Sequence, residues 1–338
     1  MKPIKKKEEL FNLWHAVSPN DDVTSLRWYC DNMLKSDDDV TTIYDQDKCV
    51  AAVGGVETIF CYNGIEIPAA MGGYLCVDPA YRDKGYSIAL GISYARYCYG
   101  LGIDLILGWE ISSKLRRLYE SAGHFLFRDY VKRTTISKTD ILPCQTNEYR
   151  IETTRRNIAK EYNEFVKKRY RNYTIHSEDA FELMRRESDF FMAYDKDGAI
   201  QGIAIRLFCT EDHYIEELIA VNDDVKNSLL SHIASYYQWD RFTYSEYGVG
   251  VEGAETSHGM IRILNAENML KRYAALHPEY KDVFTVKDEA ITQNSKTYKI
   301  SQGKCEVVAY DESFKVISVL QLSELLFDGF YLNLSVVY

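Results

Sequence analysis

The chain has 338 residues, of which 46% are hydrophobic, enough for two or three packed domains. Its formal net charge of −10 argues against a nucleic-acid surface, which needs basic patches. The sequence contains no apolar run of about 18 residues to span a membrane, and its N-terminus lacks a signal-peptide core, so we expect a cytoplasmic protein without a membrane partner.

The N-terminal third alternates helical and strand patterns. Residues 8–36 have helical periodicity, and residues 41–47 and 49–60 read as two strands. Asn63-Gly64 is a strong hairpin signal between two further apolar runs. Residues 69–77 form the next expected strand, which leads into the most informative motif of the chain.

That motif is VDPAYRDKGYSIAL, residues 77–90, which reads as a strand end, a loop and an amphipathic helix. The free N–H groups and the positive dipole end of a helix attract anions. Gly85 allows a close backbone approach, Ser87 adds a small donor, and Arg82 and Lys84 add positive charge. The loop therefore suits a pyrophosphate, although a glycine turn before an ordinary helix is the plainer alternative.

After this helix, which Gly100 and Gly102 end, the pattern continues as strand, helix and strand. Residues 104–109 read as a short buried strand, and a helix with Leu115 and Leu118 on one face follows. We expect residues 125–137 to close the sheet of this first domain.

The middle of the chain partly repeats this order. Helices are expected at 156–169 and 177–187, followed by a hairpin around Asp197-Gly198. A strand at 214–221 then leads into a helix at Val225–Tyr237. The junction Asn222-Asp223-Asp224 carries two acids and no glycine or arginine, which predicts that a second cofactor site is lost here.

The last segment starts with a strand and a helix within 260–276. An antiparallel meander is expected over 282–320, with turns at Asn294-Ser295 and Gln302-Gly303. A short helix and an apolar tail that ends at Tyr338 complete the chain.

The eight cysteines form no C-x-x-C pair and lie among apolar neighbours, so we expect reduced core residues and no metal site. They are Cys30, Cys49, Cys61, Cys76, Cys98, Cys144, Cys209 and Cys305.

The R-x-x-G-x-S spacing of residues 82–87 resembles the acyl-CoA loop of the GNAT (Gcn5-related N-acetyltransferase) superfamily. With Tyr119-Glu120-Ser121-Ala122-Gly123, EELIAV, MIRILNAENML and QLSELLFDG in this order, the chain resembles the Eis-like (enhanced intracellular survival) acetyltransferases. The resemblance implies an α/β (α+β) fold with tandem GNAT domains, each a mixed, mostly antiparallel sheet with flanking helices. It implies a catalytic domain at 1–140, a degenerate GNAT-like domain at 145–252 and a small α+β sterol-carrier-like domain at 255–338.

The activity implied by this resemblance is transfer of an acetyl group from acetyl-CoA to a primary amine of a small molecule or peptide. The resemblance is also compatible with assembly of the chain into a homo-oligomer. The alternative is a non-catalytic protein that binds CoA, or a hydrophobic ligand in its C-terminal lobe. The residues implied to contact the cofactor are Leu75, Cys76, Val77, Arg82, Asp83, Lys84, Gly85, Tyr86 and Ser87.

Three residues are candidates for proton transfer. Tyr119 stands where related enzymes keep a tyrosine acid, and a pKa near 10 suits protonation of a leaving thiolate, although plain packing beside Leu115 explains it equally. Glu110 follows a strand as a candidate base or a solvated loop acid. The resemblance implies that the carboxylate of Tyr338 reaches the active site, whereas the apolar tail favours burial. Cys76 has no histidine beside it in the sequence, which disfavours a role as nucleophile.

Overall fold

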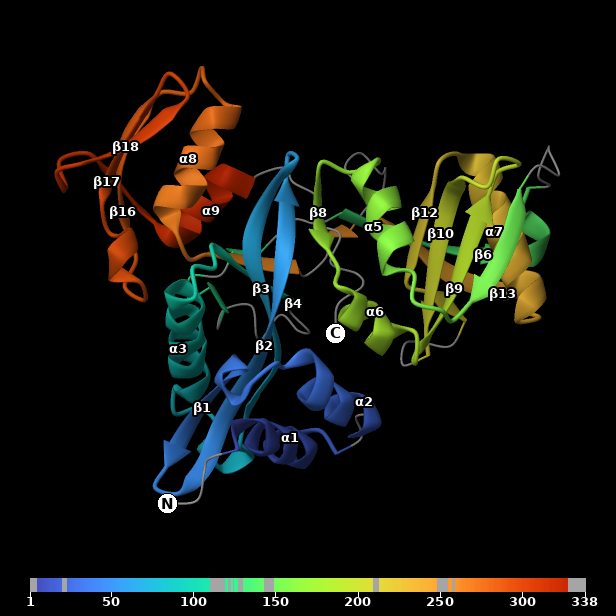
Figure 1. Cartoon of the computed structure of the whole chain (residues 1–338), viewed down its shortest axis with the longest axis horizontal. Helices are drawn as coiled ribbons and strands as arrows, with labels where there is room; N and C mark the ends of the chain where they lie inside the picture. Colours follow the sequence, from blue (N-terminus) through green and yellow to red (C-terminus); the bar gives the residue numbers. More distant parts are fainter. Residues whose placement is uncertain are drawn as a thin grey trace. The chain divides into compact units, whose positions relative to one another are not determined.

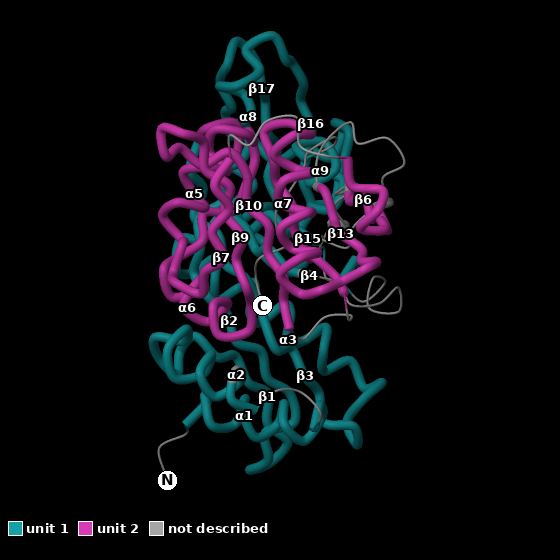
Figure 2. Tube along the Cα trace, turned by 90° about the vertical axis from the view of Figure 1, so that its right-hand side faces the viewer, with its two compact units in different colours: residues 1–60, 65–127, 258–329 teal, residues 61–64, 128–257, 330–338 magenta. Residues whose placement is uncertain are grey.

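The computed structural model describes residues 5–19, 23–109, 119–120, 123, 125–126, 130–142, 149–208, 213–247, 255–256 and 259–327. They form two compact units, each built from segments that are distant in the sequence (Figure 2). Unit 1 uses residues within 1–60, 65–127 and 258–329, and unit 2 uses residues within 61–64 and 128–257. The fold is mixed α/β with mostly antiparallel sheets and flanking helices, as expected. No helix in the described ranges is long and apolar enough to cross a membrane.

The first half of unit 1 is an antiparallel hairpin system (Figure 1). Asn63 and Gly64 both have positive φ, the conformation of the tight hairpin turn expected at this dipeptide. The strands on either side are longer than the sequence pattern suggested. The elements are α1 (Lys6–Val17), α2 (Val23–Trp28), a π-helical turn (Tyr29–Met33), a 3-10 turn (Asp37–Asp39), β1 (Val40–Asp45), β2 (Lys48–Tyr62) and β3 (Ile65–Val77).

Helix α3 (Tyr86–Gly100) covers one face of this sheet. Its buried residues Leu90, Tyr94, Ala95 and Cys98 pack on strand residues that include Val53. Leu101 and Gly102 donate to carbonyl groups of the last helical turn, so the helix ends where the glycines predicted it.

The sheet of unit 1 continues through β4 (Leu105–Trp109) to a strand from the far end of the chain. Strand β15 (Gly259–Ile263) lies between β4 and β5 (Phe125–Leu126), paired antiparallel with both. The expectation that residues 125–137 close this sheet is wrong beyond β5, because β6 (Tyr130–Ser137) pairs in unit 2. The division into three consecutive domains stays a prediction.

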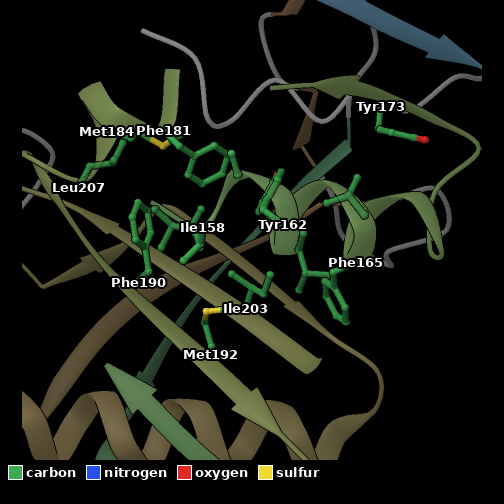
Figure 3. Close-up of a cluster of buried hydrophobic side chains, with 14 of the residues drawn as sticks. Ile158, Tyr162, Phe165, Tyr173, Phe181, Met184, Phe190, Met192, Ile203 and Leu207 are labelled. Carbon is green, nitrogen blue, oxygen red and sulfur yellow. The ribbon is translucent and has the colours of Figure 1, made fainter. Parts of the chain in front are cut away.

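Unit 2 contains two four-stranded sheets. One has the order β12-β10-β9-β7 and the other the order β11-β13-β6-β14. Figure 3 shows one core of this unit, where Tyr162, Phe181, Phe190 and Ile203 pack together, each fully buried. Its elements are a 3-10 turn (Lys138–Asp140), β7 (Arg150–Thr154), α5 (Ala159–Lys167), β8 (Asn172–Ile175), α6 (Glu178–Met184), β9 (Ser188–Tyr194), β10 (Ile200–Leu207), β11 (Tyr214–Ile215), β12 (Glu217–Ala220), α7 (Asp223–Tyr236), β13 (Arg241–Tyr247) and β14 (Glu255–Thr256).

The two units exchange equivalent strands. In each half of the chain, a strand after a long helix (β4 or β13) is followed by a two-residue strand (β5 or β14) and then by a longer one (β6 or β15). In unit 1, β15 from the second half of the chain lies between β4 and β5. In unit 2, β6 from the first half lies between β13 and β14. The two halves therefore share the arrangement of these three strands.

The remainder of unit 1 is a small α+β lobe. The expected meander is wrong in one respect, because its last strand pairs parallel with its first. Two ion pairs, one partly and one fully buried, join the lobe to the main sheet: Arg272 Nη1 lies 2.5 Å from Asp104 Oδ2, and Arg262 Nη2 lies 2.9 Å from Asp288 Oδ1. The elements are α8 (Ala266–Leu276), β16 (Asp282–Lys287), a 3-10 turn (Thr292–Asn294), β17 (Thr297–Ser301), β18 (Lys304–Val308), β19 (Lys315–Ser318) and α9 (Val319–Phe327).

Candidate functional site

The loop predicted to bind a pyrophosphate joins the end of β3 to the start of α3. Asp78 ends the strand, where its carboxylate accepts from Ala80 N–H at 2.9 Å and pairs with Lys48 Nζ at 2.6 Å. A 3-10 turn, Pro79–Tyr81, then turns the chain. Gly85 has a φ of +80° directly before the helix, and no atom lies within 4 Å of where a Cβ would stand. The loop is therefore open around the first turn of α3.

The N-terminus of α3 carries the positive end of the helix dipole. Its first bond runs from Ala89 N–H to the Gly85 carbonyl at 3.1 Å, so the preceding N–H groups stand outside the helical ladder. No side chain of the described residues caps this end, and its first turn carries no acid. Arg82 and Lys84 are exposed beside it, and Lys84 Nζ lies 4.8 Å from the centre of the Tyr81 ring. Free amides, the helix dipole and two cations are the chemistry that an anion site needs, so this helix start is the candidate for the predicted site.

Strands β3 and β4 pair for three residues and then separate. The parallel register joins Ala69, Ala70 and Met71 to residues 105–107. Beyond Met71, β3 continues to Val77, while β4 pairs with β15 on its other edge. The split leaves backbone donors and acceptors on facing edges, where an extended ligand can pair with them.

A cavity of about 50 Å³ lies at this split. Leu75 and Tyr119 line it, together with residues of α3 and of the exchanged strand β15. The other lining residues are Val53, Gly72, Gly91, Tyr94, Ile106, Leu107, Gly108 and Met260. Gly91 and Tyr94 stand about 8 and 12 Å along α3 from its first residue at a rise of 1.5 Å. The lining is apolar apart from the two tyrosine hydroxyls and the backbone.

The three predicted backbone contacts at the end of β3 differ in direction. Asp78 N–H donates to Val50 on β2 at 2.9 Å. Because N–H groups alternate sides along a strand, Cys76 also faces β2, while Leu75 and Val77 face the split. Burial raises the pKa of the Cys76 thiol to about 12, and its Sγ lies 3.7 Å from the Ala52 carbonyl oxygen. A neutral, buried thiol fits packing better than nucleophilic catalysis.

Of the proton-transfer candidates, Tyr119 alone is among the described residues, and the structure places it in the cavity wall. Glu110 and Tyr338 lie outside the described residues. The loop residues Arg82–Ser87 do not line the cavity but stand at the start of the helix that does. The candidate anion site thus lies at one end of α3, and the cavity lies further along the same helix.

Sequence reasoning missed most of the cavity wall. Glycine in a helix interior costs about 1 kcal/mol relative to alanine, so Gly91 was a signal that could have been followed. Gly72 and Gly108 are equally visible in the sequence, at the ends of apolar runs. Met260 carried no such signal, because its approach depends on the strand exchange.

Solved structures share this fold, although no protein-family model and no curated sequence matches the chain. The chain aligns over 97% of its length with a probable N-acyltransferase from Enterococcus faecalis, at a TM-score of 0.75 and 16% identity, covering 88% of that chain. A GCN5-related N-acetyltransferase from Anabaena variabilis gives a TM-score of 0.74 and 18% identity, over 96% of this chain and 88% of that one. Eis1 from Mycobacterium abscessus gives 0.67 and 12%, over 98% and 89%. The chain has the GNAT fold.

Proposed function

We propose that this chain is an acetyl-CoA-dependent N-acetyltransferase of the Eis-like kind, which transfers the acetyl group to a primary amine of a small molecule or peptide. One observation carries the proposal: the split between β3 and β4 lies beside a cavity whose wall includes α3, the helix with the uncapped, electropositive N-terminus. A thioester attached to a pyrophosphate needs an anion site for the pyrophosphate and, in line with that site, a narrow apolar slot for the thioester. The uncapped start of α3 and the cavity further along it support this proposal in a chain that has the GNAT fold.

The chemistry requires attack by the neutral amine nitrogen on the thioester carbonyl. A C–N bond forms, the C–S bond breaks, and the leaving sulfur takes a proton. In this proposal, residues 82–87 hold the pyrophosphate, and the N–H groups of Leu75 and Val77 face the thioester arm and its carbonyl oxygen. Tyr119, in the cavity wall, donates the proton to the sulfur. The amine proton passes to Glu110, to the carboxylate of Tyr338 or to water.

The wider setting follows the same resemblance. We infer that residues 145–252 form a GNAT-like half without a cofactor and that residues 255–338 form a sterol-carrier-like lobe. The negative net charge, −10, suits a cationic amine acceptor. A cytoplasmic location and assembly with further copies of the chain are part of this proposal.

The test is calorimetry with acetyl-CoA followed by a screen of primary amines, read as release of free thiol. We expect binding at one site per chain and thiol release with at least one amine. Aminoglycosides, polyamines and peptides with a free N-terminus form the first panel. Binding without release for any amine would favour a non-catalytic CoA-binding protein. Failure to bind CoA would contradict the proposal and leave a hydrophobic-ligand carrier as the alternative.

A further inference from the structure

Three glycines around the cavity leave space that the fold itself does not need. Gly91 lies within α3, and no atom approaches within 4 Å of its would-be Cβ. Gly108 on β4 would place a Cβ 3.7 Å from Met260 Cε, and Gly72 on β3 would place one 3.4 Å from Tyr94 Cε1, both ordinary contacts. None of the three has a positive φ. Alanine would fit each backbone, and would stabilise the helix at Gly91, so these glycines keep volume open.

Tyr94 closes one side of this space. Its ring lies over the sheet at Gly55 and Gly72, so closely that a Cβ on Gly55 would meet the hydroxyl at 1.8 Å. Tyr94 is 5% exposed, and among the described residues its hydroxyl has no hydrogen-bond partner of good geometry, although the Cys98 thiol is near. Gly72 is the first residue after the pairing with β4 ends, so Tyr94 stands at the apex of the split. A chain that enters from the anion site ends against this ring.

We propose that Tyr94 limits the length of the acyl group that the donor thioester carries, and that the cavity accepts only short, uncharged acyl groups. The inference rests on the proposed function, because it concerns the donor of the same reaction. The cavity has a volume of about 50 Å³, and Tyr94 stands in its wall. Among the described residues that line it, none carries a charged side chain. A carboxylate at the end of the acyl chain would be buried without a partner, which is costly.

The experiment measures affinity without an acceptor, using acetyl-, propionyl-, butyryl-, hexanoyl- and succinyl-CoA in calorimetry. For the wild type we expect acetyl- and propionyl-CoA to bind at least tenfold more tightly than hexanoyl- or succinyl-CoA. Tyr94→Ala and Tyr94→Leu open the apex and should reduce the preference for acetyl- over hexanoyl-CoA at least tenfold. Tyr94→Phe keeps the ring and should keep the preference.

Two further variants complete the experiment: one fills the cavity, and the other is a control outside it. Gly91→Val fills the cavity from the helix and should weaken propionyl- and butyryl-CoA more than acetyl-CoA. Tyr97→Ala removes a tyrosine of the same helix that does not line the cavity, and should leave the chain-length profile unchanged. Circular dichroism checks that each variant folds. If Tyr94→Ala does not fold, the test uses Tyr94→Leu and Gly91→Val instead.

The outcomes separate this inference from the proposed function. Tight binding of acetyl-CoA with an unchanged profile in the folded Tyr94 variants would overturn the inference and leave the acetyltransferase proposal standing. Equal affinity of the wild type for hexanoyl- and acetyl-CoA would overturn it in the same way. A wild type that binds no acyl-CoA would overturn both. A shift in Tyr94→Ala or Tyr94→Leu that Tyr97→Ala does not reproduce supports the inference.

Discussion

Helices α3 and α7 occupy equivalent places in the two halves of the chain, yet their first turns differ in capping and charge. The N-terminus of α3 is uncapped, follows a glycine with positive φ and carries no acid. In α7, Asn222 Oδ1 accepts from Val225 N–H at 2.9 Å, and Asp223 and Asp224 occupy the first turn. The side-chain cap takes a donor that an anion would need, and the acids repel it. The first half thus has a candidate anion site at the place where the second half has a capped, acidic helix start.

The spaces beneath the two helices differ in the same sense. Strand β11 pairs parallel with β13 for two residues and then gives way to β12, which pairs with β10, so the split of unit 1 has a counterpart. In unit 2, however, Leu229, Leu230 and Ile233 of α7 are fully buried against the sheet. In unit 1 the helix presents Gly91 to a cavity. In the second half, buried side chains of α7 thus pack against the sheet, whereas in the first half α3 borders a cavity.

The largest expected effect is on kcat, and it compares a tyrosine of the cavity wall in unit 1 with a buried tyrosine of unit 2. Tyr119→Phe keeps the ring and removes the acid, so kcat should fall by roughly 10²–10⁴ with KM for acetyl-CoA little changed. Tyr244→Phe in unit 2 is the control and should leave kcat unchanged. Steady-state thiol release measures both. A wild-type kcat in Tyr119→Phe would assign the protonation to water.

The next effect compares the glycine at the start of α3 with a hairpin glycine of unit 2 that has matched backbone geometry. Gly85 and Gly198 have φ values of +80° and +81°, and both have open space around them. Gly85→Asp adds a charge at the anion site and should lower CoA affinity by at least about 100-fold, whereas Gly198→Asp in the unit 2 hairpin should not. Calorimetry gives both affinities. Equal losses would mean that the backbone conformation, and not the anion site, matters. A stoichiometry of two CoA per chain would contradict the comparison itself.

A third pair of variants compares the helix–sheet interface of unit 1, which borders the cavity, with that of unit 2, which side chains fill. A Cβ on Gly202 of β10 would meet Val225 Cγ1 at 2.7 Å and Leu229 Cδ1 at 2.8 Å, so Gly202→Ala should lower the free energy of unfolding by about 1–3 kcal/mol. Gly72→Ala meets Tyr94 at 3.4 Å and should stay within about 1 kcal/mol of the wild type while it weakens acyl-CoA binding. Urea unfolding and calorimetry measure the pair. A stable Gly202→Ala would show that unit 2 is looser than its contacts indicate.

The smallest expected effect is the pH dependence of the free energy of unfolding that a buried histidine of unit 2 causes. Burial lowers the pKa of His176 to about 3, and its ring packs beside Tyr162 and Phe181. The folded pKa lies below the ordinary value of about 6.5, so the unfolded chain binds more protons below that pH. This residue's contribution is complete above pH 6.5 and falls by about 1.4 kcal/mol per unit as the pH drops toward 3. His176→Leu should remove about 2 kcal/mol of the loss between pH 7 and pH 5 in urea unfolding. The same pH slope in the variant would contradict this assignment.

The features that the sequence determined by itself are those that local chemistry controls. The hairpin turn at Asn63-Gly64, the open loop before α3 and the acids at the start of α7 depend on glycine conformations, charges and helix ends within a few residues. The cavity and the strand exchange depended on tertiary structure. Strand β6 has a period-2 pattern that suits either sheet, and only its pairing with β13 and β14 assigns it to unit 2. Met260 likewise reaches the cavity because β15 lies beside β4, a contact between residues about 150 positions apart. Local patterns specify turns and helix ends, whereas the partner of a strand is decided by long-range hydrogen bonding and by which core its apolar face can fill.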